Sequence, residues 1–339
     1  MSIEMRYFKY HFWETRIRLV ILCVLSVLYF SNMADYSDGI VAVDYMVYAG
    51  FILAVFVPIR EFQMFNTRRN LDTWFSMPID RWKMALVHLL NGALHIALTL
   101  LTGMIFVALH VSTNAAYYNL FQLVVYFLIM LALTLLAYGF FCFVFTQGNS
   151  TTDGTLFIIN YLFLPTVFYD IFMDQYFENT PRVFYGITTL MGTTSRGLQS
   201  VFWGDGRFSN SFWTEEFGTG SGSELFIVNL VLNVLICGAA TVFMLRLFNR
   251  KHTEKVEDVS DSWFGFRTLI PVMAVLTIAS PNGLAAYAFR IVFIYVAYII
   301  YRKGVHLKRS DYCVIVVYAA LLFMMACVSP AASSFWWLI

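Results

Sequence analysis

Nine stretches of this chain are apolar over lengths that approach the thickness of a lipid bilayer. A helix rises about 1.5 Å per residue, so about 20 apolar residues cross a hydrocarbon core of roughly 30 Å. Of the 339 residues, 60% are hydrophobic and only 13% are charged, whereas a soluble chain carries about 25% charge. This composition predicts an all-α integral membrane protein. The runs lie at about 16–33, 41–60, 84–109, 118–146, 154–173, 223–247, 263–280, 284–301 and 311–328.

The distribution of Lys and Arg predicts the orientation of the chain, because cytoplasmic loops of membrane proteins carry an excess of both. With the N-terminus inside, the outer segments near 34–40 and 110–117 hold no Lys or Arg. Arg182, Arg196 and Arg207 fall outside, all in one long loop, where the rule is weaker. We therefore expect a cytoplasmic N-terminus and, after nine spans, an outer C-terminus. The expected cytoplasmic segments are 1–15, 61–83, 147–153, 248–262 and 302–310.

The order of apolar and polar segments predicts a six-span core with a C-terminal extension. The first 15 residues are amphipathic and aromatic, which is typical of a helix lying on the inner membrane surface. A segment of mixed charge, NRKHTEKVEDVSD, follows the sixth run and is typical of a solvated linker. The predicted parts are the interfacial helix 1–15, the core 16–248 with an outer loop at 174–222, the linker 249–262 and a three-span extension at 263–339.

The most charged segment of the first half, REFQMFNTRRNLDTWFSMPIDRWK at 60–83, separates the second and third runs. Leu71, Trp74, Phe75 and Pro78 follow the i, i+3, i+4, i+7 spacing of one helix face. Because proline disfavours helix at the residue before it, we expect a short amphipathic helix at 66–76, a turn, and a new helix with Pro78 near its first position. Such a helix could lie on the inner leaflet with its aromatic rings in lipid, or could dock in a groove of a cytoplasmic partner.

Motifs for several kinds of chemistry are absent from the sequence. It contains no G-x-x-x-x-G-K-[ST], H-E-x-x-H or G-x-S-x-G, so it predicts neither a phosphate-binding loop nor these two hydrolytic sites. A formal net charge of +1 gives no reason to expect nucleic-acid binding. Five cysteines form no C-x-x-C pair, so no disulfide framework or zinc site is predicted from them.

A few polar residues within the apolar runs are candidates for function. His88 and His95 share a helix face, but two imidazoles do not complete a metal site and no carboxylate stands at ligand spacing, so we predict no metal site there. Arg290 is a charge inside the membrane, for which Asp170 is a candidate partner. A packing ion pair, snorkelling to the interface, and a substrate or proton pathway all remain open. Asp153, in QGNSTTDG, is expected to cap the fifth span.

The segment TRRNLDTWFSMPIDRWKMALVHLLNG resembles a known family, the ABC-2 type permease subunits of bacterial ATP-binding-cassette exporters, in their Gram-positive antibiotic- and peptide-related branch. The pattern is a basic residue, an Asp, then Ser–apolar–Pro–apolar and an Arg before the third span. The six-span organisation of residues 1–250 is also similar, and the extension resembles longer members of this branch. In this sequence the pattern is carried by Arg69, Asp72, Ser76, Met77, Pro78, Ile79 and Arg81.

The resemblance implies a fold like that of type V exporters in a bacterial plasma membrane, and two permease chains per complex, identical or not. A separate ATPase, which holds ATP and Mg²⁺, would dock on residues 66–76, and this chain would itself be no enzyme and bind no cofactor. The implied function is export of a peptide, antibiotic or lipid-like substrate. A non-transporting peptide sensor or scaffold, and an intramembrane enzyme using His88, His95 or Asp170, are the alternatives. The implied docking residues are Arg68, Arg69, Leu71, Asp72, Trp74, Phe75, Ser76, Met77, Pro78 and Arg81.

Overall fold

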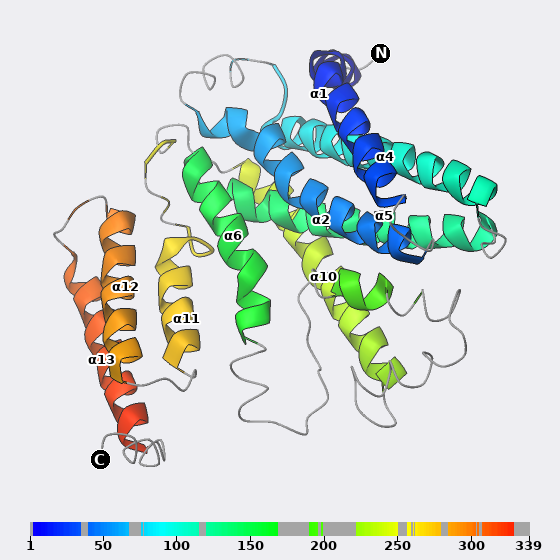
Figure 1. Ribbon diagram of the computed structural model, residues 1–339. Coiled ribbons are helices and arrows are strands. Elements are labelled where there is room, and N and C mark those ends of the chain that lie inside the picture. Colours follow the sequence, from blue (N-terminus) through cyan, green and yellow to red (C-terminus); the bar gives the residue numbers. More distant parts are fainter. Residues whose placement is uncertain are drawn as a thin grey trace. The chain divides into compact units, whose positions relative to one another are not determined.

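The structure is a computed structural model in which every regular element of the described residues is a helix (Figure 1). It describes residues 3–34, 40–67, 76, 78–114, 120–168, 190–195, 198, 222–249, 256–258, 260, 262–278, 284–302, 304 and 307–328. The principal helices are α1 (Ile3–Ala34), α2 (Ile40–Phe62), the 3-10 helix η1 (Gln63–Asn66), α4 (Arg81–Asn114), α5 (Leu120–Thr146), α6 (Thr151–Phe168), α10 (Gly222–Phe248), α11 (Phe266–Ile278), α12 (Leu284–Arg302) and α13 (Arg309–Val328).

A helix lies within each of the nine apolar runs, because an isolated apolar segment can satisfy its backbone hydrogen bonds internally only as a helix. Among the described residues, four segments are long and apolar enough to cross a membrane: Met46–Asn66, Arg81–Leu109, Phe121–Thr146 and Ile227–Phe248. The prediction of an all-helical membrane protein is thereby confirmed, and the nine-span arrangement and its orientation stay predictions.

The chain divides into two compact units. The first comprises Met1–Leu162 and Thr180–Asp258, and the second comprises Phe163–Asn179 and Val259–Ile339. In the first unit α2 packs against both α4 and α5, α1 packs along α4, and α10 packs on α5. Figure 1 shows α2, α4 and α5 running side by side, with α1 crossing α4.

Glycines allow the closest helix contacts in the first unit. A Cβ at Gly92 of α4 would overlap the Tyr138 hydroxyl of α5, and a Cβ at Gly103 would overlap the Phe30 ring of α1. Tyr138 and Phe30 are almost completely buried in these positions. The absence of a side chain at Gly92 and Gly103 therefore allows α5 and α1 to approach α4 closely.

Four segments predicted to be cytoplasmic meet at one end of the first unit. They are the start of α1, the α2–α4 connection with its flanking residues, the α5–α6 loop, and the chain after α10. Four hydrogen bonds connect these segments: Lys83 Nζ–Glu4 Oε1 at 2.9 Å, Asn66 Nδ2–Ser150 O at 3.4 Å, Trp82 N–Asn249 Oδ1 at 3.0 Å and Glu257 N–Asn149 O at 2.9 Å. The contacts agree with the prediction that all four segments lie on the same side of the membrane.

Two predicted helix starts are wrong. The helix after the α2–α4 connection begins at Arg81, not near Pro78, and the Asp80 carbonyl accepts hydrogen bonds from the backbone N–H groups of Lys83 and Met84. The cap of α6 is Ser150, since its hydroxyl accepts the Asp153 N–H at 3.1 Å.

Asp153 instead stands in the first turn of α6, where a carboxylate favours the positive end of the helix dipole. A serine three residues upstream therefore supplies the cap that the sequence had suggested for the aspartate.

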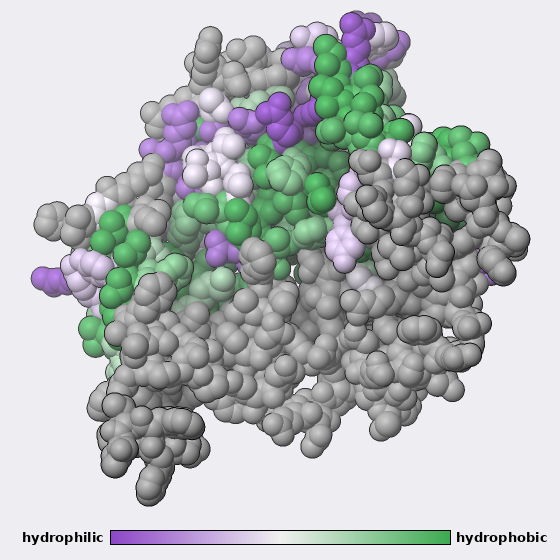
Figure 2. Space-filling view, in the orientation of Figure 1, coloured by the Kyte–Doolittle hydropathy of each residue, from purple (hydrophilic) through white to green (hydrophobic). Residues whose placement is uncertain are grey.

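The surface of α1 is strongly apolar despite its charged beginning. Ile17, Val20, Val24 and Leu28 are each more than half exposed. Figure 2 shows hydrophobic side chains along the visible side of α1 and hydrophilic ones around its first turns. A lipid environment would cover this apolar side.

The second unit has its own core, formed where α11, α12 and α13 pack together. Its polar feature is the turn between α12 and α13, where the Arg302 guanidinium donates two hydrogen bonds to Asp311, at 2.8 and 2.9 Å. The buried core side chains are Ile270, Ala274, Ile294, Tyr298, Tyr301 and Tyr318.

Candidate functional site: a buried polar network around Glu61

A fully buried carboxylate lies near the C-terminal end of α2. Glu61 has no exposed surface, although an ionised carboxylate in a nonpolar interior costs several kcal/mol unless it is paired. Such residues in a membrane protein usually face the bundle interior and find partners there. The neighbours of Glu61 therefore define the most informative site of the described structure.

Side chains from α1 and α4 surround both oxygens of Glu61. Oε1 receives the guanidinium of Arg18 and the amide of Asn91, the latter at 3.1 Å. Oε2 lies 3.0 Å from His11 Nε2 and 3.4 Å from His88 Nδ1. Side chains of α1 and α4 thus meet the Glu61 carboxylate of α2, and each carboxylate oxygen has two hydrogen-bond partners.

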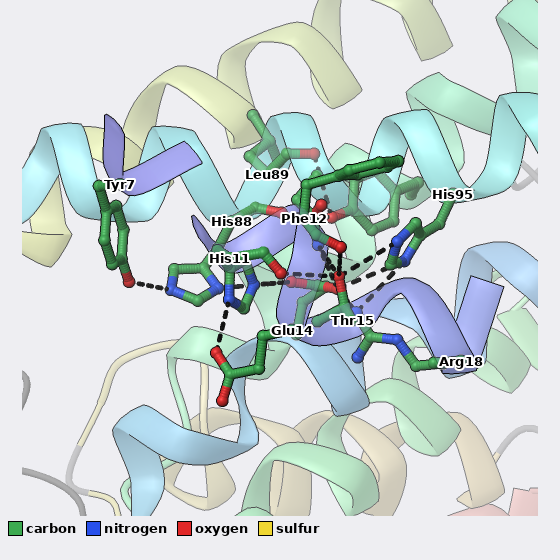
Figure 3. A network of polar contacts seen from close by, with 12 residues as sticks. Tyr7, His11, Phe12, Glu14, Thr15, Arg18, His88, Leu89 and His95 are labelled. Atoms are coloured by element: carbon green, nitrogen blue, oxygen red, sulfur yellow. Dashed lines mark hydrogen bonds and ion pairs between the residues drawn. The ribbon is translucent and has the colours of Figure 1, made fainter. Parts of the chain in front are cut away.

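A second layer of contacts extends this network along the α1–α4 interface. The Tyr7 hydroxyl lies 2.8 Å from His88 Nε2. His95 lies between Thr15, whose hydroxyl is 3.3 Å from Nε2, and Arg18, whose guanidinium is 3.2 Å from Nδ1. Figure 3 shows Tyr7, His11, Thr15 and Arg18 on α1 facing His88 and His95 on α4.

The surroundings of the network favour the neutral forms of His11 and Tyr7 on α1. Burial lowers the pKa of His11 to about 4, an effect that Glu14 opposes and Arg18 reinforces, so this imidazole is uncharged at neutral pH. Burial also raises the pKa of Tyr7, which keeps its phenol protonated and able to donate a hydrogen bond to His88. The compensating positive charge beside Glu61 is therefore that of Arg18.

Aromatic rings close the network on the side of the α2–α4 connection. The Phe65 ring of η1 meets the His88 ring at right angles, with ring centroids 4.8 Å apart, and meets Phe248 of α10 at 5.0 Å. Both phenylalanines are almost completely buried. This apolar lining excludes water and strengthens the electrostatic contacts inside it.

Such a network can do two things chemically. It fixes the relative positions of α1, α2 and α4, because breaking a buried charge pair leaves the other charge without compensation. It also gathers two imidazole nitrogens and a carboxylate oxygen, His11 Nε2, His88 Nδ1 and Glu61 Oε2, within 4.8 Å of one another.

Most of the docking residues expected in the α2–α4 connection lie outside the described residues. Ser76 and Pro78 are described and exposed, and Arg81 is the first residue of α4. Asp170 also lies outside the described residues, and Arg290 is described only as a backbone position within α12. The docking residues outside the described part are Arg68, Arg69, Leu71, Asp72, Trp74, Phe75 and Met77.

The environment of His88 and His95 differs from what the sequence suggested. No carboxylate stands at ligand spacing from them along the chain, but the fold brings Glu61 to 3.4 Å from His88 and 3.7 Å from His95. Sequence reasoning missed Glu61 because residues 61–83 were assigned to a cytoplasmic segment.

A periodic signal for this network was nevertheless present in the sequence. One helix face of α1 carries polar residues at i, i+4 and i+7, and one face of α4 carries them at i, i+3 and i+7. Two matching polar faces on apolar helices predict a buried contact between those helices. The residues are His11, Thr15 and Arg18 on α1, and His88, Asn91 and His95 on α4.

Comparisons of the chain with protein-family models, with curated proteins and with solved structures find no match.

Proposed function

We propose that this chain is the transmembrane permease subunit of an ABC transporter, exporting a peptide, antibiotic or lipid-like substrate. ATP and Mg²⁺ would bind a separate ATPase, and a second permease chain would complete the pathway across a bacterial plasma membrane. The chain would itself catalyse no reaction. The proposal depends on the Ser76–Arg81 pattern in the connection between two helices of membrane-crossing length.

The observation that supports this proposal most is the position of the Glu61 network beside that connection. Glu61 lies six residues before Thr67, where the connection leaves η1, and His88 lies seven residues after Arg81, where α4 begins. A force applied to the connection would therefore act directly on helix ends that are joined to each other and to α1. A loose loop between independent helices would transmit no such force.

The mechanism that follows is mechanical. Closure of the ATPase on ATP would push the 66–76 segment toward the membrane and tilt α2 and α4 together. Arg18 and His11 would make α1 follow, because separating them from Glu61 would expose a buried carboxylate to an apolar interior. The cost of breaking the network favours a concerted movement of the three helices.

The test is co-purification with an ATPase that contains a P-loop and whose reading frame neighbours that of this chain. Asp72→Lys, Trp74→Ala and Arg81→Glu are each expected to reduce association and ATPase stimulation. Arg309→Glu is the matched control, because Arg309 is exposed in α13 and lies outside the first unit. Unchanged association and stimulation in all three variants would remove the basis for the proposal.

A non-transporting peptide sensor with the same fold remains the second candidate, since it would dock an ATPase in the same way. ATP-dependent accumulation of a candidate peptide in inverted membrane vesicles favours the exporter. Peptide binding without accumulation favours the sensor.

A further inference from the structure

The Glu61 network contains three potential metal ligands from three helices. His11 Nε2 of α1, Glu61 Oε2 of α2 and His88 Nδ1 of α4 all lie within 4.8 Å of one another. We propose that these three atoms form a binding site for a divalent transition-metal ion of the zinc class. This inference does not depend on the proposed transport function.

Two of the three separations between the ligand atoms suit such an ion, and the third is within 4.8 Å. His11 Nε2 and His88 Nδ1 lie 3.0 and 3.4 Å from Glu61 Oε2. Zinc holds nitrogen and oxygen ligands at about 2.0–2.2 Å, which places neighbouring ligands of a tetrahedral site about 3.3–3.5 Å apart. Small side-chain adjustments would bring all three atoms to one ion.

The type of ligand also indicates the class of metal. Imidazole nitrogens with one carboxylate suit zinc and neighbouring first-row metals, whereas calcium and magnesium prefer oxygen alone. Three protein ligands leave a fourth position for water or another small ligand. The nearest described aromatic ring, Phe65, lies against His88 and would shield the ion from bulk water.

One of the two imidazoles, that of His88, already has the partner that a metal-bound histidine requires. Histidines that bind a metal through one nitrogen usually donate the other N–H to an oxygen, which fixes the ring. His88 Nε2 lies 2.8 Å from the Tyr7 hydroxyl, and His11 Nδ1, which is buried and makes no hydrogen bond, faces the Glu14 carboxylate at 3.7 Å. His11 Nε2 and His88 Nδ1 are the ring nitrogens that lie nearest to Glu61 Oε2, at 3.0 and 3.4 Å.

The two oxygens of Glu61 divide their roles in the same arrangement. Arg18 and Asn91 contact Oε1, so Oε2 is the atom that faces the two imidazoles. Without an ion, both imidazoles would donate N–H groups to Oε2. The metal-free and metal-bound states therefore differ in whether His11 Nε2 and His88 Nδ1 carry protons, and a measurement of metal binding distinguishes them.

The test uses the full-length protein in lipid nanodiscs, purified with a tag that contains no histidine and stripped with a chelator. Zinc affinity is measured by competition with a chromophoric chelator, and Co²⁺ is added as a spectroscopic probe. We expect one zinc per chain and the visible absorption of four-coordinate Co²⁺. His88→Gln should abolish both, while Tyr7→Phe, which keeps all three ligands, should weaken zinc binding by about 10–100-fold.

Cys237→Ser is the matched control, because Cys237 is a buried potential metal ligand on α10 and is not among the side chains that surround Glu61. Its zinc affinity should equal that of the unaltered protein. Zinc binding below one equivalent in the unaltered protein, or equal binding in all variants, would overturn the proposal. If His88→Gln does not fold, the Co²⁺ spectrum of the unaltered protein and the Tyr7→Phe affinity decide the question.

Discussion

The two units of this protein each hold a buried or nearly buried carboxylate paired with an arginine, but the pairs differ in reach. Glu61 contacts Arg18 and His11 across 43 and 50 residues of sequence, and no part of its side chain is exposed. Asp311 contacts Arg302 across nine residues, in the turn between consecutive helices. The first pair joins two helices at positions far apart in the sequence, whereas the second closes a turn.

This difference indicates how far the loss of each pair should affect the stability of the protein. A long-range buried pair opposes the separation of whole helices, and its loss leaves an uncompensated charge in the interior. Loss of a short-range pair costs less where the arginine is partly exposed and neighbouring groups still donate hydrogen bonds to the carboxylate. We therefore expect variants of the Glu61 network to affect the whole first unit and variants of the Arg302 pair to act locally.

The largest effect is expected for Arg18→Met, which removes the charge beside Glu61 but keeps much of the apolar stem. The first unit should lose about 3–5 kcal/mol of stability, since a buried carboxylate loses its compensating charge. Alkylation of Cys142, which is completely buried in α5, reports opening of this unit. The rate should rise strongly in Arg18→Met and stay unchanged in Arg16→Met, an exposed position of the same helix.

A smaller loss is expected for Gly92→Ala. The added methyl group would overlap the Tyr138 hydroxyl, which donates to the Leu89 carbonyl at 3.3 Å, and overpacking of this kind costs about 1–3 kcal/mol. Thermal unfolding in detergent measures the effect. Gly238→Ala in α10 is the control, because a Cβ there meets no atom within 4 Å; equal midpoints for the two variants would contradict the helix contact.

The smallest effect is expected for Arg302→Met in the second unit. The Arg302 side chain is 19% exposed, and the Lys308 N–H and the Ser310 hydroxyl stay beside the Asp311 carboxylate, so loss of the bidentate pair should cost about 1 kcal/mol. The alkylation rate of Cys142 should not change, since that residue belongs to the first unit. A large rise in this rate would show that the two pairs do not differ in the way described.

The helices of this fold could be predicted from the sequence, because apolar length and helix formation are linked by the bilayer. Each of the nine runs contains a helix, although α1 extends without interruption from Ile3 through the segment expected to be a separate interfacial helix. Helix starts were less predictable. Pro78 suggested a start that in fact lies at Arg81, since the position of a cap depends on local hydrogen bonds.

The candidate site could be predicted only in part. His88 and His95 were recognised as a pair on one helix face, but their carboxylate partner belongs to another helix 27 residues upstream of His88. Glu61 looked like an ordinary charge at a membrane boundary, because its position in the sequence alone does not show whether its side chain faces other helices or the cytoplasm. The pairing of α1 with α4 depends on tertiary packing, which no single run of residues specifies.

The most direct test of the proposed coupling compares two variants in one assay of ATPase association and ATPase stimulation. Asp72→Lys, in the proposed docking segment, should lose both. Arg18→Met, examined below its unfolding temperature, should keep association but lose stimulation, because the docking segment is intact while α1 no longer follows α2 and α4. Normal stimulation in a folded Arg18→Met protein would contradict the claim that the Glu61 network carries movement from the α2–α4 connection into the membrane.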